Sequence, residues 1–228
     1  MRVGGFKAVL LDLDGVILDS MHLHAQTWQE VLGELGLTVP LEFILRHEGA
    51  LGPEVLHRFV AEHAPHLAGG ADLARAEAVM AGLLERQAGL YLERHARRVR
   101  PYPGARRLLE GLARAGLPAA LVTSSRRALV ETSLAPELRG QFQALVTAED
   151  VRRHKPHPDP YLAGAAALGA RPQDCLVVEN APAGIASAAA AGATCYALAT
   201  TLGPESLGQA QAVFADLEEL AVHLGLWE

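Results

Sequence analysis

The first strong pattern along the chain is a short apolar run that leads into acidic residues. The run Val9–Leu11 contains no polar residue, which predicts a strand buried on both faces of a sheet. It continues into Asp12, Leu13, Asp14 and Gly15. Because side chains alternate along an extended chain, the two Asp side chains are expected on one side and Leu13 on the other. The pattern predicts two carboxylates together at the end of a buried strand.

The next stretch shows helical spacing and no strand pattern. Apolar residues within 21–35 recur every three or four positions, and Gly36 is a typical helix end. Further helices are predicted at 41–47, 53–63 and 71–98. Residues 20–98 are therefore expected to form an all-helical insert.

Beyond the turn sequence at 101–104, strands and helices alternate. Apolar runs predict strands at 118–122, 144–146, 175–178, 194–199 and 213–214. Helices are predicted at 105–115, 126–134, 159–168, 181–191 and 217–224. Strict alternation implies right-handed crossovers and a parallel sheet. The predicted fold class is α/β: a doubly wound parallel-sheet (Rossmann-like) core formed by 1–19 and 99–228, with the helical domain 20–98 inserted after the first strand.

Polar residues gather where the predicted strands end, which is where ligands bind in such sheets. These residues are Asp12, Asp14, Thr123, Ser124, Ser125, Arg126, Lys155, Glu179 and Asn180. Two carboxylates at the end of a buried strand are costly unless a cation accompanies them. A divalent metal ion, or a reaction that uses both carboxylates, would account for them. The simpler alternative is that Asp12 and Asp14 cap a turn in which Gly15 has a positive φ.

The lysine at position 155 strengthens the functional interpretation. Of 20 basic residues 18 are Arg, and Lys7 is the only other lysine. A lysine offers a compact point charge where Arg would be larger and planar. Carboxylates, hydroxyls and one lysine form the set required for phosphoryl transfer through an aspartyl phosphate, in which one carboxylate attacks phosphorus and a second acid protonates the leaving oxygen and then activates water. Mg²⁺ prefers oxygen ligands and offsets the repulsion between carboxylate and phosphate.

Composition argues against several classes of partner. The 228 residues are half apolar, the net charge is −6, and no basic stripe occurs, so nucleic acid is not expected as the main partner. No stretch of about 18 uncharged apolar residues predicts a membrane span. The first residues run directly into a strand, so no signal peptide is expected. Cys175 and Cys195 adjoin apolar runs and are expected to be buried free thiols of a cytoplasmic protein, with a monomer as the default.

Four motifs follow one another along the chain: DLDGV at 12–16, VTSS at 122–125, KPHPDPYL at 155–162 and VVENAPAGI at 177–185. In these motifs the chain resembles the haloacid dehalogenase superfamily of phosphohydrolases, over essentially its whole length. Within it the chain is most similar to the branch that includes β-phosphoglucomutase and small sugar-phosphate phosphatases. The resemblance implies that residues 20–98 form a cap that closes over the site.

The resemblance also implies a role for each matching residue. It makes Asp12 the nucleophile and Asp14 the general acid and base, and it places Mg²⁺ between Asp12, the backbone carbonyl of Asp14, Glu179 and Asn180. It assigns Thr123 and Lys155 to the phosphoryl group and gives His24 a match in the family's caps. Substrate contacts are predicted from His24 and from Gly15, Ser124 and Arg126, which follow strand ends. Family members often have Asp at the position of Asn180, so this chain has one negative charge fewer there.

Several matching residues also have simpler interpretations. His24 falls where the family's caps have a His that contacts the acid/base residue, but it is equally consistent with an ordinary polar helix residue. Arg126 could contact a second anionic group of the substrate or be a solvated residue of a first helical turn. Arg86 is interpreted as part of a solvated charged face. Gly49 matches a cap-loop glycine of the family, but the Arg that follows it in the mutases is absent.

The predicted function is a Mg²⁺-dependent phosphatase that hydrolyses a small phosphorylated metabolite, in particular a sugar phosphate, through an aspartyl phosphate. The family's dehalogenases lack an Asp at the position of Asp14, whose presence favours cleavage of a phosphate ester. One alternative is a phosphosugar mutase, against which the missing Arg after Gly49 argues. The other is a non-catalytic sensor of a phosphorylated ligand, against which the full set of acidic, hydroxyl and lysine side chains argues.

Overall fold

The core of the molecule is a parallel β-sheet. The computed structural model describes residues 4–47 and 73–227, and within them the six strands lie in the order β3-β2-β1-β4-β5-β6. All neighbouring strands are parallel. The strands are β1 (Ala8–Leu11), β2 (Ala119–Val122), β3 (Ala144–Val146), β4 (Cys175–Glu179), β5 (Thr194–Leu198) and β6 (Ala212–Phe214). The predicted fold class is confirmed.

The strand order reverses beside β1. From β1 the chain proceeds to β2 and β3 on one side, and β4, β5 and β6 follow on the other. The carboxyl end of β1 is therefore the topological switch point, where open α/β sheets bind their ligands. Asp12 and Asp14 follow directly after this strand end.

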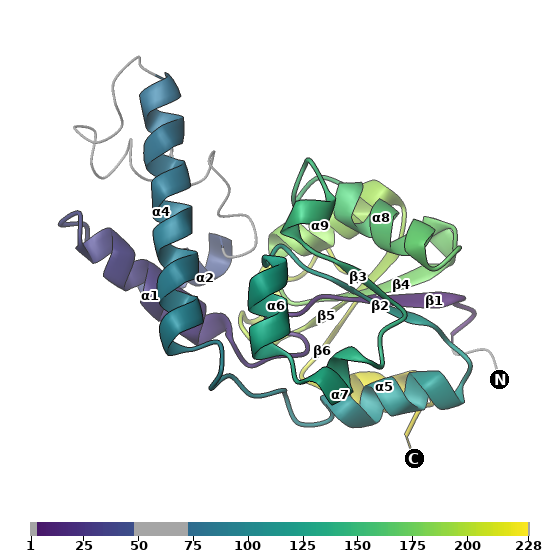
Figure 1. The fold of residues 1–228 in the computed structure, drawn as a ribbon. Coiled ribbons are helices and arrows are strands. Elements are labelled where there is room, and N and C mark those ends of the chain that lie inside the picture. Colours follow the sequence, from purple (N-terminus) through teal and green to yellow (C-terminus); the bar gives the residue numbers. More distant parts are fainter. Residues whose placement is uncertain (1–3, 48–72, 228) are drawn as a thin grey trace.

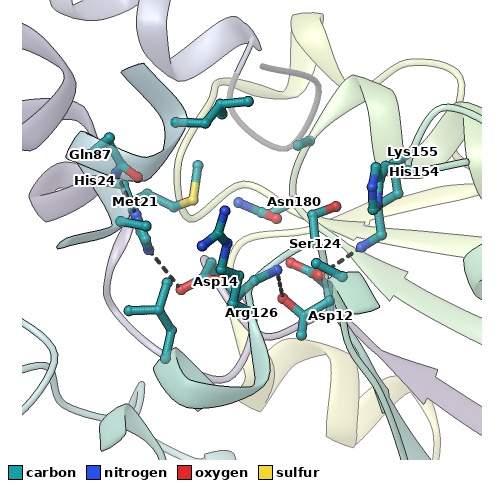
Figure 2. A pocket seen from close by; sticks show the side chains of 18 of the residues that line it. Asp12, Asp14, Met21, His24, Gln87, Ser124, Arg126, His154, Lys155 and Asn180 are labelled. Atoms are coloured by element: carbon teal, nitrogen blue, oxygen red, sulfur yellow. Dashed lines mark hydrogen bonds and ion pairs between the residues drawn. The ribbon is translucent and has the colours of Figure 1, made fainter. Parts of the chain in front are cut away.

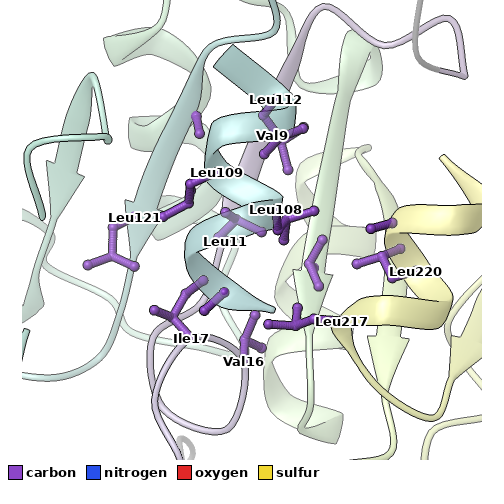
Figure 3. Close-up of a cluster of buried hydrophobic side chains, with 14 of the residues drawn as sticks. Val9, Leu11, Val16, Ile17, Leu108, Leu109, Leu112, Leu121, Leu217 and Leu220 are labelled. Atoms are coloured by element: carbon purple, nitrogen blue, oxygen red, sulfur yellow. The ribbon is translucent and has the colours of Figure 1, made fainter. Parts of the chain in front are cut away.

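Helices cover both faces of the sheet (Figure 1). Val9 and Leu11 pack in the apolar cluster beneath α5 (Ala105–Arg114) and α10 (Leu217–His223) (Figure 3), whereas Ala8 and Leu10 pack in the cluster beneath α8 (Asp159–Ala167) and α9 (Pro182–Ala191). All four side chains are fully buried, as expected for a strand enclosed on both faces. The core helices are α5 (Ala105–Arg114), α6 (Arg127–Ser133), α7 (Pro136–Arg139), α8 (Asp159–Ala167), α9 (Pro182–Ala191) and α10 (Leu217–His223).

The insert forms a separate group of helices beside one end of the sheet (Figure 1). Its described helices are α1 (Met21–Gly33), α2 (Leu41–His47) and α4 (Leu73–Arg94). They share an apolar core that includes Trp28, Ile44 and Leu90. No strand occurs in the described part of 20–98. The helix predicted at 53–63 and Gly49 lie outside the described residues.

The two connections of the insert run side by side. The Asp19 amide donates to the carbonyl of Arg100 at 2.9 Å, and the Tyr102 amide donates to the carbonyl of Ile17 at 2.9 Å. Leu18 and Pro101 form an isolated antiparallel bridge between these bonds. This pairing agrees with the predicted domain limits at 19/20 and 98/99, which stay a prediction.

Some elements differ from the sequence-based expectation. The first insert helix ends at Gly33 because the chain turns before Gly36, whose φ is +74°. The long helix ends at Arg94, where the Ala96 amide bonds back to Tyr91 and breaks the helical pattern. Four short helices were not predicted: α7 and three 3₁₀ helices at Ala148–Asp150, Pro172–Asp174 and Pro204–Ser206. Three of the four begin with Pro, which suits the first position of a helix.

Candidate active site

Gly15 allows the chain to turn sharply after β1. Its φ is +84°, and a Cβ atom at this position would lie 1.9 Å from Nδ2 of Asn180. Only glycine fits this turn and this close approach. The positive φ named in the simpler turn interpretation is present, and the turn brings the Asn180 side chain against the loop that contains Asp12 and Asp14.

Lys155 joins two buried carboxylates. Its Nζ donates to Oδ1 of Asp12 at 2.6 Å and to Oε1 of Glu179 at 2.7 Å, and the lysine side chain is 3% exposed. One ammonium group faces two carboxylates, so the cluster keeps a net negative charge. Burial, which Lys155 only partly offsets, raises the pKa of Asp12. Burial opposes the ammonium charge as well, but the two carboxylates outweigh it and raise the pKa of Lys155.

Glu179 is held by four donors. Oε1 accepts from Lys155 and, at 2.6 Å, from the Tyr161 hydroxyl, while Oε2 accepts from the backbone amides of Asn180 and Ala181. A carboxylate has about four acceptor positions, so a metal ion could bind Glu179 directly only by displacing a donor. In this arrangement Glu179 orients Lys155 toward Asp12.

Asp14 has different surroundings from Asp12. Its Oδ1 accepts from the Ser20 hydroxyl at 2.6 Å and lies 3.2 Å from Nε2 of His24, and its Oδ2 accepts from the Ser125 hydroxyl at 2.6 Å. Burial by itself would raise the pKa of Asp14, but the imidazole and the two hydroxyls outweigh burial and lower it to about 2. The two carboxylates therefore differ in pKa, as expected for two groups with different tasks.

His24 reaches Asp14 from the cap. Its ring stacks on Tyr91 with centroids 3.7 Å apart, and its Nδ1 lies 3.2 Å from Nε2 of Gln87. His24, Gln87 and Tyr91 are all buried. The expected contact between His24 and Asp14 is present, and it links the cap helices α1 and α4 to the loop after β1.

The loop after β2 presents hydroxyl groups. Thr123 is buried and its Oγ1 accepts from the Ser125 amide at 2.9 Å. The Ser124 Oγ is also buried and has no hydrogen-bond partner among the described residues. A buried hydroxyl without a partner is costly. Ser124 is therefore suited to a ligand that brings an acceptor.

Two arginines that the sequence singled out form ion pairs with glutamates. Arg126 donates from both guanidinium ends to Glu85 on α4, so the pair joins the core to the cap. Arg86 donates to Glu34 at 2.8 Å on the exposed side of the cap, in agreement with its interpretation as part of a solvated face.

A cavity of about 810 Å³ lies between the core and the cap, and Asp12, Asp14 and Lys155 line it. Figure 2 shows Asp12, Asp14, Lys155 and Asn180 around it. The cap contributes Met21, Trp28, Leu84 and Gln87. The structure thus brings together every site residue that the sequence singled out; Gly15 alone does not line this cavity but supports Asn180 from behind.

The donor set around the cavity suits a hard cation. Among the described residues no three His, Cys, Asp or Glu side chains come close enough to hold a metal ion. Mg²⁺, however, is usually held by one or two carboxylates with other oxygen atoms, substrate phosphate and water. Asp12 has one oxygen that accepts no hydrogen bond among these residues, and the Asn180 amide lines the same cavity. Oxygen atoms of this number and kind fit Mg²⁺.

Sequence reasoning assigned no role to Ser20, Ser125, Gln87, Tyr161 or Thr201. Each contacts a residue that it did single out. Two of the five had a signal in the sequence, because Ser125 belongs to the VTSS motif and Tyr161 to the KPHPDPYL motif. The others become visible through tertiary contacts.

Comparison with known proteins places the chain in a family of hydrolases. The model of the haloacid dehalogenase-like hydrolase family matches residues 6–192. Hexitol phosphatase A of Escherichia coli is 35% identical over 223 residues, covering 97% of this chain and 95% of that protein. β-Phosphoglucomutase of Bacillus subtilis is 30% identical over 222 residues, covering 96% and 93%.

A solved structure supports the same assignment. The crystal structure of a hydrolase from Pseudomonas syringae superposes with a TM-score of 0.80 at 27% identity, over 96% of this chain and 97% of that one. The chain belongs to the haloacid dehalogenase-like hydrolases. The predicted family, and its branch with a helical cap, are confirmed. No helix among the described residues is long and apolar enough to cross a membrane.

Proposed function

We propose that this protein is a Mg²⁺-dependent phosphatase that hydrolyses the phosphate monoester of a small polyhydroxylated metabolite, such as a sugar phosphate. The observation on which this rests is the pair of carboxylates with different surroundings in one cavity. Asp12 is fixed by Lys155 through one oxygen only, and Asp14 is fixed by two hydroxyls and His24. Relatives that include a hexitol phosphatase support a phosphorylated polyol or sugar as the substrate class.

In the first step, the oxygen of Asp12 that Lys155 does not hold attacks phosphorus, and the bond from phosphorus to the leaving oxygen breaks. Asp14 gives its proton to the leaving oxygen, which departs as an alcohol. A bound phosphate adds negative charge next to Asp14, which raises its pKa and favours the protonated form needed for this step.

In the second step, Asp14 removes a proton from water, the water oxygen attacks phosphorus, and Asp12 and inorganic phosphate are released. Lys155, Thr123 and Ser124 hold the phosphoryl oxygens throughout in this proposal. Mg²⁺, held by Asp12, the Asp14 backbone carbonyl and the Asn180 amide oxygen, would neutralise the charge that gathers on the phosphoryl group. Glu179, predicted as a further ligand, holds Lys155 in place.

The cap completes the site. His24 contacts Asp14 from cap helix α1, so this contact forms only when the cap lies against the core, and Gln87 of α4 holds the other ring nitrogen of His24 within the cap. Closure excludes bulk water from the cavity and protects the aspartyl phosphate until Asp14 activates a single water. The predicted domain limits 20–98, the monomeric state and the cytoplasmic location stay predictions.

The mutase alternative requires the same cavity to hold a second phosphate. Arg126 is the side chain lining the cavity that could bind such a group by one of its two sequence-based interpretations, and its guanidinium is already paired with Glu85. We therefore favour a substrate whose leaving group is uncharged. A non-catalytic sensor would need neither the unbonded oxygen of Asp12 nor the hydrogen-bonded environment of Asp14, so the sensor alternative does not account for them.

Phosphate release from a panel of phosphorylated sugars, polyols and organic acids tests the proposal. With Mg²⁺ present, we expect release from one group of sugar or polyol monophosphates, and chelation with EDTA should abolish it. Absence of release from every member of the panel, with the protein folded, would rule out the phosphatase.

Replacing Glu85 tests the preference for an uncharged leaving group. Glu85→Gln frees Arg126, so kcat/KM for a sugar bisphosphate should rise roughly 3- to 5-fold relative to the monophosphate of the same sugar, the size expected for one exposed ion pair. The double variant Glu85→Gln with Arg126→Gln should lose this gain. If kcat/KM changes by the same factor for both substrates, the ion pair affects only cap closure and not the choice of leaving group.

A further inference from the structure

The amide of Asn180 is anchored by a hydroxyl from the neighbouring strand connection. Asn180 follows β4 and Thr201 follows β5 at the same edge of the sheet. Nδ2 of Asn180 donates to Oγ1 of Thr201 at 2.9 Å. Asn180 is 1% exposed and lines the cavity.

An amide has two unlike ends, and in this contact the nitrogen faces Thr201, whose hydroxyl accepts from it. The nitrogen only donates and the oxygen only accepts. Because the nitrogen is bonded to Thr201, the oxygen is the end that remains for the cavity. A metal cation needs the oxygen, and a reversed amide would point N–H groups at it.

The packing around Asn180 adds to this constraint. A Cβ on Gly15 would lie 1.9 Å from Nδ2, so the nitrogen end of the amide lies directly against the glycine. The hydroxyl of Thr200, next to Thr201, donates to the carbonyl of Gly15 and holds that loop in place. The amide is therefore confined between the Gly15 turn and Thr201.

We propose that Thr201 is a positioning residue for the metal site: by accepting from Nδ2, it keeps the Asn180 oxygen directed at Mg²⁺. The proposal rests on the function proposed above. A carboxylate at position 180 would present an oxygen to the metal in either orientation, because both of its ends are oxygen. An amide presents an oxygen in only one orientation and therefore needs a partner for its nitrogen. The importance of Thr201 should therefore depend on Asn180 being an amide.

Direct binding of Mg²⁺ to the full chain, measured by isothermal titration calorimetry without substrate, tests this dependence. Thr201→Val keeps the shape of the side chain and removes the hydroxyl, and it should weaken Mg²⁺ binding about 10-fold, the lower end of the range for losing a partner of a metal ligand. Thr201→Ser keeps an acceptor and should bind within about 3-fold of the original chain. Thr132→Val is the matched control, because the Thr132 hydroxyl bonds the carbonyl of Ala128 within α6 and no site residue among those the structure describes, and it should leave binding unchanged.

The decisive comparison repeats Thr201→Val in the Asn180→Asp background. In that background Thr201→Val should lower the Mg²⁺ affinity by less than about 3-fold, because either carboxylate oxygen can serve as ligand. Equal Mg²⁺ affinity of the original chain and Thr201→Val would overturn the proposal. An equal loss in both backgrounds would overturn it too, since Thr201 would then act on the loop as a whole. If the original chain itself binds no Mg²⁺, the Mg²⁺ dependence of the proposed function is wrong, and the role of Thr201 falls with it. This result differs from the two above, in which the original chain binds Mg²⁺.

Discussion

Asp12→Asn is expected to lower kcat for phosphate release by about 10⁴-fold or more, with the fold intact. An amide cannot attack phosphorus, and the unbonded oxygen that we assign to the attack is lost. KM should change far less, because Lys155, Thr123 and Ser124 still hold the phosphate. Steady-state kinetics on the substrate found in the panel measures both parameters.

The stability of this variant provides its control. In the folded protein the pKa of Asp12 is raised. The ionised carboxylate therefore lowers the stability of the fold once the pH rises above the pKa that Asp12 has in the unfolded chain. Asn does not ionise, and Lys155 keeps Glu179 as a partner. In the absence of Mg²⁺ near pH 8, Asp12→Asn should unfold at an equal or higher temperature. A fall in kcat of less than about 100-fold in a folded Asp12→Asn protein would contradict the assignment of the nucleophile.

Lys155→Met is expected to abolish activity and also to lower the free energy of unfolding by about 3–5 kcal/mol. The lysine is the only cation that touches Asp12 and Glu179 among the described residues, and both carboxylates are buried. Removing it leaves two buried negative charges side by side. Urea unfolding of the variant and of the original chain gives the difference.

A second substitution separates charge from packing in this prediction. Lys155→Met combined with Glu179→Gln removes one of the two unpaired charges, while Tyr161 can still donate to the glutamine oxygen. Part of the lost stability should return. If the free energy of unfolding of Lys155→Met lies within about 1 kcal/mol of that of the original chain, Lys155 does not balance the charge of the two carboxylates as described.

The fold, and the gathering of Asp12, Asp14, Lys155 and Glu179 around one cavity, could be predicted because their signals are local. The buried run before Asp12 marks a central strand, and strict alternation of strands and helices places all the following strand ends at one edge. Lys155 stood out because this chain otherwise uses Arg. These signals depend on periodicity and order along the chain, which survive without knowledge of tertiary contacts.

The partners of these residues could not be predicted in the same way. Glu85 is one of many charged residues on its helix, and nothing local selects Arg126 as its partner 41 positions away. Ser20 reaches Asp14 because the turn after Gly15 folds the chain back, with the Gly15 amide bonded to the carbonyl of Leu18 at 2.8 Å. Thr201 has no motif around it. Such contacts depend on how loops from different strands meet.

The central claim, hydrolysis through a phosphorylated Asp12, is tested most directly by mass spectrometry of enzyme quenched in acid during turnover. We expect the peptide that contains Asp12 to gain the mass of one phosphoryl group, and the gain to disappear in Asp12→Asn. In Asp14→Asn, which leaves the nucleophile but removes the base that activates water, any phosphorylated form should persist longer. Two results together would contradict the account: the original chain turns over without any phosphorylated Asp12 peptide, and the Asp12→Asn variant still releases phosphate.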